Sequence, residues 1–391
     1  MARKPLDLSV FSLNLRKHVD PASPAPMRLM AAKGVVPMAP QEMGLVLYQL
    51  AHDEDSRVSK AAGETLRGTP DAILSTAVSA QLPELVLDWM AESLVSNEAV
   101  IKELVLNPQL SPSALAKVAG SASAEVCDLI AENQVRLLQN PGVIEALYMN
   151  PKARMSTVDK LVDLARRNGV DLKGLPALRP LLESNEKIDV EENEQLAQLN
   201  DERFEEYLQQ SLEESEKEEE EAGSLRELSE EELNELFSDE NTKKKTEEAD
   251  EGRSSNRQHY LSKLTISQKI RVATLGSATD RGYLVRETNR LVHMAAVASP
   301  KAGDRDALAW SANRSLPDGV ISFIANKRDW LRHYQVKLNL VNNPKLPLQK
   351  ALKLLPFLYP KDLQQLTKNR NIPNVLARAA KQLSDKRRGS R

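Results

Sequence analysis

The fold class follows from a repeated pattern: Asn97-Glu-Ala-Val-Ile-Lys-Glu-Leu-Val-Leu-Asn-Pro108 returns 43 residues later as Asn140-Pro-Gly-Val-Ile-Glu-Ala-Leu-Tyr-Met-Asn-Pro151. In each copy, apolar residues recur three and four positions apart, which places them on one face of an α-helix. Each copy ends in Asn-Pro, and the residue before a proline disfavours the helical conformation, so we expect each helix to end there. The apolar faces comprise Ile101, Leu104 and Val105 in the first copy and Ile144, Leu147 and Tyr148 in the second.

A second amphipathic helix is expected after each Asn-Pro end. In the later unit, its apolar face comprises Val158, Leu161, Val162 and Ala165. A pair of short helices cannot bury its apolar faces alone and has to stack on neighbouring pairs. A period of about 40 to 47 residues is the length of a two- or three-helix repeat unit. The pattern therefore predicts an all-α protein built from stacked helical repeats.

The same pattern returns in the C-terminal third of the chain. Val297-Ala-Ser-Pro-Lys-Ala-Gly303 aligns with Val341-Asn-Asn-Pro-Lys-Leu-Pro347 at an offset of 44 residues. Prolines stand where several of the expected helices begin, a position that tolerates proline. We therefore expect residues 257–391 to form a second stack of short helices.

These repeats resemble the HEAT- and armadillo-type α-solenoid repeats, and their Asn-Pro helix ends resemble those of the bacterial leucine-rich repeat variant. The resemblance is to a repeat architecture, and it covers about 70% of the 391 residues. It implies two HEAT-like α-solenoid domains, and stacks of this kind generate extended binding surfaces.

Charge divides the chain into three parts. Residues 1–182 hold 19 basic and 20 acidic residues, residues 183–251 hold 7 and 28, and residues 253–391 hold 27 and 8. The net charge of −3 therefore conceals an acidic part of −21 and a basic part of +19. Few apolar residues and a high like charge favour disorder in the acidic part. We expect a Pro-rich, irregular N-terminal arm (1–41), an N-terminal α-solenoid (42–182), an acidic, largely disordered linker (183–256) and a basic C-terminal α-solenoid (257–391).

The acidic linker contains two short amphipathic segments, residues 204–212 and 225–237. Acidic helices with a narrow apolar stripe suit a hydrophobic groove with a basic rim. The alternative is a flexible linker whose helices contact nothing. The candidate partner-docking residues are Phe204, Tyr207, Leu208, Leu212, Leu225, Leu228, Leu233, Leu236 and Phe237.

The basic C-terminal region mixes cations with aromatic residues over 326–337. We expect this stretch to be helical, with Arg328 and Arg332 on one face. Phosphate binding needs several cations on one surface, and base stacking needs accessible aromatic rings. The alternative is that Trp330 and Tyr334 belong to the core and that the cations only solvate the surface. The candidate polyanion-binding residues are Lys327, Arg328, Arg332, Lys337, Lys386, Arg387 and Arg388.

Catalytic and metal-binding patterns are absent from the sequence. No two histidines stand at metal-ligand spacing, and no Gly-x-Ser-x-Gly, Walker or dinucleotide-binding glycine pattern occurs. The single cysteine, Cys127, lies in an apolar helical phrase and is expected to be a small buried hydrophobe. No signal peptide or membrane-spanning stretch is recognisable. We therefore expect a cytoplasmic protein that is not an enzyme and holds no cofactor or metal.

The leading prediction is a non-enzymatic helical-repeat scaffold or adaptor that binds protein partners through its concave surfaces. The alternative is a nucleic-acid-associated protein that binds a polyanion through the basic C-terminal α-solenoid, with the acidic linker masking that surface. A regulatory subunit of an enzyme is a third interpretation.

Overall fold

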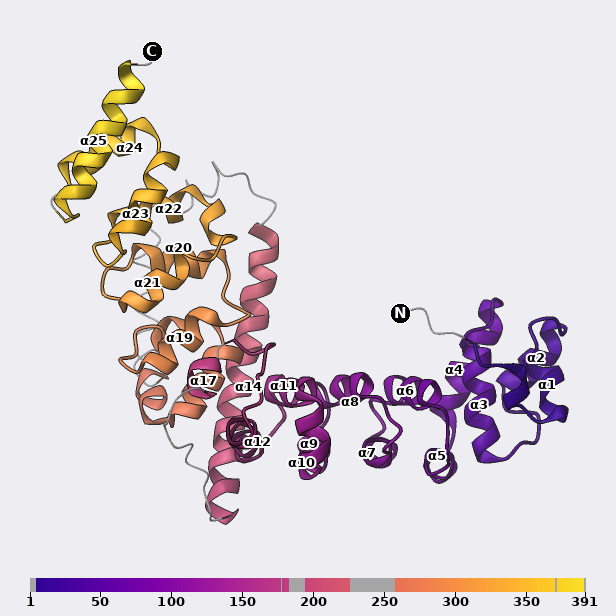
Figure 1. Cartoon of the computed structure of the whole chain (residues 1–391). Helices are drawn as coiled ribbons and strands as arrows, with labels where there is room; N and C mark the ends of the chain where they lie inside the picture. Colours follow the sequence, from indigo (N-terminus) through magenta and orange to yellow (C-terminus); the bar gives the residue numbers. More distant parts are fainter. Residues whose placement is uncertain (1–4, 177, 183–193, 226–256, 370, 390–391) are drawn as a thin grey trace. The chain divides into compact units, whose positions relative to one another are not determined.

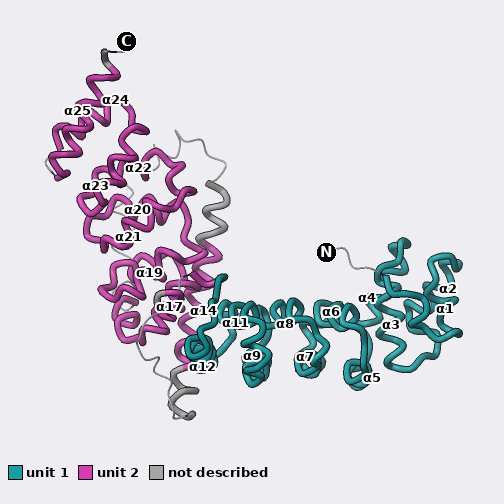
Figure 2. The backbone as a smooth tube through the Cα atoms, viewed as in Figure 1, with its two compact units in different colours: residues 1–174 teal, residues 175–391 magenta. Residues whose placement is uncertain are grey.

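The computed structural model describes residues 5–176, 178–182, 194–225, 257–369 and 371–389. Every regular element in these ranges is an α-helix or a short 3-10 helix, so the all-α prediction is confirmed (Figure 1). The chain divides into two compact units, residues 1–174 and residues 175–391 (Figure 2).

The N-terminal residues are not the irregular arm that their prolines suggested. Pro26 and Pro40 stand in the first turn of a helix, where a missing N–H costs nothing, so they begin helices rather than break them. Leu15 and Ala32 are buried, and the first two α-helices pack against the two that follow. These elements are η1 (Leu8–Val10), α1 (Leu13–Val19), α2 (Ala25–Ala32), α3 (Pro40–Ala51) and α4 (Ser56–Gly68).

From α3 onward, the helices of the first unit form two rows (Figure 1). One row comprises α3, α5, α7, α9 and α12, and the other comprises α6, α8 and α11. All ten apolar residues predicted to face the core in this part of the chain are buried. The helices are α5 (Asp71–Val78), α6 (Glu84–Ser93), α7 (Glu98–Leu106), α8 (Pro112–Ala119), α9 (Ala124–Glu132), α10 (Gln134–Gln139), α11 (Pro141–Met149) and α12 (Met155–Arg167).

The asparagines of the Asn-Pro ends join successive helices of each row. Asn107 and Asn150 have extended ψ angles of 121° and 115°, as expected before proline. The Asn107 amide donates to the carbonyl of Val78 at 2.9 Å, and the Asn150 amide donates to those of Ala119 and Ala122 at 2.7 and 2.9 Å. Each asparagine therefore ends its own helix and also ties that helix to the end of the preceding one in the row.

The second unit repeats this arrangement. One row runs through α17, α19 and α21, and α20 packs against α22. The elements are α13 (Arg179–Leu182), α14 (Glu194–Leu225), α17 (Ile266–Leu275), α18 (Ala278–Leu284), α19 (Arg290–Ala298), α20 (Asp304–Ala312), α21 (Asp318–Ile324), η2 (Trp330–Arg332), α22 (Tyr334–Asn342), α23 (Leu348–Leu354), η3 (Leu355–Phe357), α24 (Pro360–Lys368) and α25 (Asn374–Gly389).

Polar joints also occur at the two aligned stretches of this unit. The Asn343 amide donates to the carbonyl oxygens of Ser311 and Asn313 at 3.3 and 3.1 Å. In the earlier copy, the Ser299 hydroxyl donates to the carbonyl of Thr274 at 3.0 Å. The sequence alignment therefore marks equivalent positions in the structure.

Helix α14 lies within the predicted acidic linker, yet it packs against α17 and α18 of the second unit. Its buried residues follow one another at alternating spacings of three and four, which is the pattern of a helix with one buried face. The alternative in which this amphipathic segment contacts nothing is therefore wrong. The buried residues are Asp201, Phe204, Leu208, Ser211 and Ser215.

Candidate functional site

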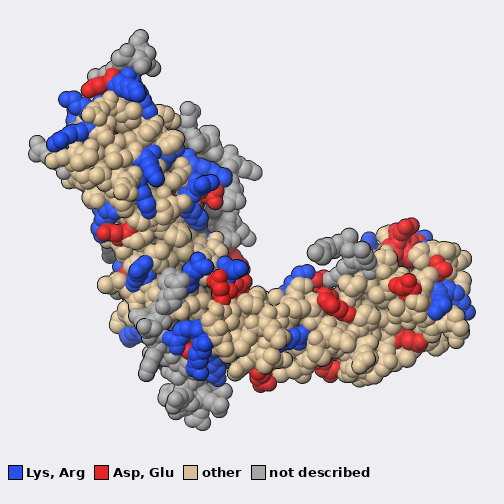
Figure 3. All heavy atoms as spheres, viewed as in Figure 1, with Lys and Arg blue, Asp and Glu red and all other residues tan. Residues whose placement is uncertain are grey.

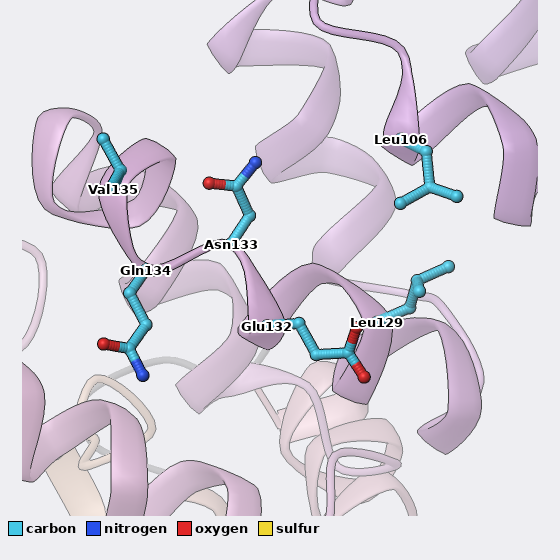
Figure 4. Close-up of a pocket in the computed structure, with 6 residues that line it drawn as sticks. All are labelled: Leu106, Leu129, Glu132, Asn133, Gln134 and Val135. Atoms are coloured by element: carbon cyan, nitrogen blue, oxygen red, sulfur yellow. The ribbon is translucent and has the colours of Figure 1, made fainter.

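An open apolar groove lies on the first unit, at the junction between α9 and α10 (Figure 4). Leu106 and Val135 are 63% and 68% exposed, so the groove presents apolar surface to solvent. Its volume is about 480 Å³, and it is lined by Leu106, Leu129, Glu132, Asn133, Gln134 and Val135.

Two polar side chains fix the shape of this groove. Asn133 ends α9, and its side-chain oxygen accepts the backbone N–H of Arg136 at 3.1 Å, which starts α10 in a new direction. The Arg136 guanidinium donates to the carbonyls of Val105 and Leu110 at 2.9 and 2.6 Å. Burial lowers the pKa of Arg136, but an arginine remains protonated in proteins. These charge-assisted bonds tie α10 to the end of α7 and hold the groove open.

The cations predicted to share a helix over 326–337 do not do so. The chain turns before the 3-10 helix Trp330–Arg332, and α22 begins only at Tyr334. Arg328 and Arg332 therefore lie on different elements, and the predicted shared face is wrong.

Burial of Trp330 accounts for this interruption. Its ring packs edge-on against Trp310 and Phe323, with centroid distances of 6.4 and 6.2 Å. The Lys327 ammonium lies 3.8 Å from the centroid of the same ring, a cation–π contact, and burial lowers the pKa of Lys327. The interpretation of Trp330 as a core residue is confirmed, and Lys327 covers it.

The remaining predicted cations near this point are separate from one another. Arg332 pairs with Asp329 at 3.0 Å, and Arg328 is exposed. Lys386 is exposed on α25, and the side chain of Arg388 lies outside the described residues.

Two other predicted cations, Lys337 and Arg387, meet at an exposed aromatic residue that was not predicted as a site residue. Phe357 is 63% exposed, and the Lys337 ammonium lies 5.8 Å from its ring centroid. The Arg387 guanidinium donates to the carbonyls of Pro356 and Leu358 at 2.6 and 2.7 Å, on either side of Phe357. Helices α22 and α25 therefore place their cations around η3.

A second exposed ring lies two residues further along the chain. Tyr359 is 61% exposed and stacks on Tyr334, with ring centroids 4.1 Å apart and an interplanar angle of 31°. The Tyr334 hydroxyl accepts the backbone N–H of Tyr359 at 3.0 Å and donates to the Asp362 carboxylate. Burial and then the bond to Asp362 raise the pKa of Tyr334 to about 12. We call Tyr334, Phe357 and Tyr359, with Lys337 and Arg387, the aromatic surface.

A sequence signal for the aromatic surface exists in Pro356-Phe-Leu-Tyr-Pro360. A proline at each end of this stretch predicts that no continuous helix crosses it. Leu358 is buried, and the two aromatic residues that flank it are left outside.

The first predicted docking segment is already occupied within its own unit. Phe204 and Leu208 are buried against this unit, and Tyr207 and Leu212 are half-buried. This stripe is therefore not free for another protein. Of the second segment, Leu225 ends α14 without a described side chain, and four residues lie outside the described ranges: Leu228, Leu233, Leu236 and Phe237.

Asp280 on α18 is the polar centre of the contact that α14 makes within the second unit. The carboxylate is fully buried and accepts hydrogen bonds from the Tyr207 hydroxyl at 2.7 Å and from the Ser211 hydroxyl. The Arg257 guanidinium donates to it at 2.7 Å and also pairs with Glu214 of α14 at 2.6 Å. Burial and the adjacent Asp280 charge raise the pKa of Tyr207. This network fixes α14 through polar contacts that the apolar stripe did not reveal.

Among the described residues, no group of three or more His, Cys, Asp or Glu side chains is arranged to hold a metal ion. Cys127 is buried, as expected. In the same part of the chain, we find no helix with the length and apolar character needed to cross a membrane. Comparison with protein-family models, curated protein sequences and solved structures gives no match for this chain.

Proposed function

We propose that the chain is a non-enzymatic, cytoplasmic scaffold or adaptor, built from two HEAT-like α-solenoid units, that binds protein partners. Support comes from the two rows of helices in the first unit and from the joints that Asn107 and Asn150 make between neighbours. In stacks of this kind, each repeat contacts mainly its neighbours, and the stack offers extended surfaces for binding.

The observation that carries the proposal is the apolar groove beside α10. Leu106, Leu129 and Val135 give it an apolar lining, and Arg136 holds it in place without a ligand. A volume of about 480 Å³ accommodates a few apolar side chains from one face of an amphipathic helix. Glu132 at the edge suits a basic residue on that helix.

Affinity capture from cells that make the protein tests this role. We expect Leu106→Glu to lose the partners that the unchanged chain retains, because a carboxylate in the groove has to be desolvated on binding. The matched control is Leu13→Glu, since Leu13 is 79% exposed on α1 and lies outside the groove. Equal recovery of the same partners by all three chains would contradict the proposal.

A second candidate function is polyanion binding by the C-terminal unit. Residues 326–391 hold 16 Lys or Arg and three Asp or Glu, a net charge of +13. Two of the three acidic residues are engaged, Asp329 with Arg332 and Asp362 with Tyr334. On the face that Figure 3 displays, Lys and Arg side chains clearly outnumber acidic ones over this part of the chain.

Heparin chromatography of the full chain tests the second candidate. Binding should weaken linearly in log salt, because each phosphate or sulfate contact releases a counterion. The acidic segment is proposed to mask this surface, so replacing Glu218, Glu219, Glu220 and Glu221 by Gln should raise the salt needed for elution. Failure of the full chain and of this variant to bind heparin at low salt would contradict the second candidate.

A further inference from the structure

We infer that the aromatic surface binds single-stranded nucleic acid, with bases stacked on Phe357 and Tyr359 and phosphates placed beside Lys337 and Arg387. This inference rests on the second candidate function, polyanion binding by the C-terminal unit. It adds a site, a class of ligand and a mode of recognition.

The two rings are exposed, whereas the other described aromatic side chains of this unit are buried or half-buried. Trp310 and Trp330 lie in the core, whereas Phe357 and Tyr359 are more than 60% exposed. Aromatic side chains carry a large apolar area, so leaving two of them in water forgoes a substantial hydrophobic stabilisation. A bound ligand that covers the ring faces would recover it.

The rings are also held in place before any ligand arrives. Tyr359 is fixed by the stacked ring of Tyr334 and by the hydrogen bond from its own N–H to the Tyr334 hydroxyl. The backbone on both sides of Phe357 is held by Arg387, whose guanidinium donates to the carbonyls of Pro356 and Leu358. Pre-organised rings lose little conformational entropy on binding, which favours affinity.

The charge around the rings selects an anionic ligand. The Lys337 ammonium lies 5.8 Å from the Phe357 ring centroid, and the Arg387 guanidinium donates to the carbonyl of the next residue, Leu358. Asp362 is the single acidic residue between positions 330 and 384, and its carboxylate accepts the Tyr334 hydroxyl. The phosphates of a nucleic acid can pair with these cations, and the unpaired bases of a single strand can stack on the exposed rings.

A single strand fits this surface better than a duplex. In a duplex the base faces are stacked on one another, so two exposed rings have nothing to stack on. Flat rings beside cations are the recurring arrangement of proteins that bind single strands without reading sequence. We therefore expect a preference for single strands over duplexes and little preference among base sequences.

Fluorescence anisotropy with the full chain tests the inference, using a labelled oligo(dT) strand, a duplex of the same length and labelled heparin. The single strand should bind at least about tenfold more tightly than the duplex. Phe357→Ala should raise the Kd for oligo(dT) roughly 5- to 100-fold, because one stacked base is lost, while leaving the Kd for heparin unchanged. The matched control is Val375→Ala, since Val375 is 53% exposed on α25 of the same unit.

A conservative variant keeps the test independent of folding defects. Phe357→Trp should bind oligo(dT) within about threefold of the unchanged chain, and stacking should quench the added indole fluorescence. If Phe357→Ala leaves oligo(dT) binding unchanged, or weakens heparin binding equally, the stacking inference is wrong and polyanion binding stands. If no probe binds at low salt, both the stacking inference and the proposed polyanion binding are wrong. If Phe357→Ala removes a captured protein but leaves oligonucleotide binding unchanged, the surface binds protein instead.

Discussion

The side-chain amide nitrogen of Asn150 lies 2.7 Å from the carbonyl oxygen of Ala119, which ends the preceding helix in the same row. Asn150 is fully buried, and its amide also reaches the carbonyl of Ala122 at 2.9 Å. One side chain thus supplies the N–H donor for two backbone carbonyls, which the Cys127 thiol approaches only at 4.0 and 3.9 Å. The joint between neighbouring helices is therefore partly polar and depends on an amide at this position.

Replacing Asn150 by Ala should lower the free energy of unfolding by about 2 kcal/mol, because two carbonyl oxygens lose their amide donor and keep only the weak donor of the Cys127 thiol. Urea denaturation followed by circular dichroism measures the change. The matched control is Asn168→Ala, because the exposed Asn168 amide donates only within its own helix, to the carbonyl of Leu164. We expect a loss of at most about 0.5 kcal/mol there. Equal losses for the two variants would show that the Asn150 joint contributes nothing specific.

Replacing Asp280 by Asn should weaken the packing of α14 against α17 and α18. The substitution keeps the side-chain shape but leaves Arg257 with Glu214 as its charged partner, and breaking a buried ion pair costs about 3 kcal/mol. Hydrogen exchange of the amides in residues 201–215 should therefore accelerate strongly. Asp318→Asn is the control, because Asp318 is exposed at the start of α21. Unchanged exchange in α14 of the Asp280→Asn chain would contradict the account of this contact.

Tyr334 should ionise later than an ordinary tyrosine, because burial and its hydrogen bond to Asp362 raise its pKa to about 12. The folded-state pKa lies above the unfolded value of about 10, so the contribution of this group to stability is complete below pH 10. That contribution is lost as the pH rises from about 10 through 12.

The difference in tyrosinate absorbance between the unchanged chain and Tyr334→Phe measures this titration. Its midpoint should lie near pH 12 in the folded protein and near pH 10 in urea. A midpoint near 10 in both conditions would contradict the burial and the hydrogen bond described for Tyr334.

The packed short helices were predictable because apolar residues at helical spacing, such as Ile101, Leu104 and Val105, become buried when such helices pack together. The Asn-Pro ends were also predictable, since the conformation before proline is a local property. The second role of Asn150 was not, because its acceptor Ala119 is 31 residues away and becomes a neighbour only after stacking.

Each difference from the sequence-based prediction has its own physical cause. The prolines of residues 1–41 predicted an irregular arm, but Pro26 and Pro40 stand in first turns, where proline begins a helix, and composition does not distinguish the two positions. A helix over 326–337 fitted the local pattern, but burial of Trp330 against Trp310 interrupts it. The contacts of Asp280 and Arg257 with α14 could not be predicted, because their partners Tyr207 and Glu214 lie far away in the sequence.

Hydrogen exchange of the full chain, with and without a captured partner, tests whether the groove beside α10 binds protein. We predict slower exchange on binding at residues 104–107 and 129–136, which contain the lining residues of the groove, and no such change in the Leu106→Glu chain. Protection confined to other helices of the first unit, with residues 104–107 and 129–136 exchanging as in the free chain, would contradict the claim.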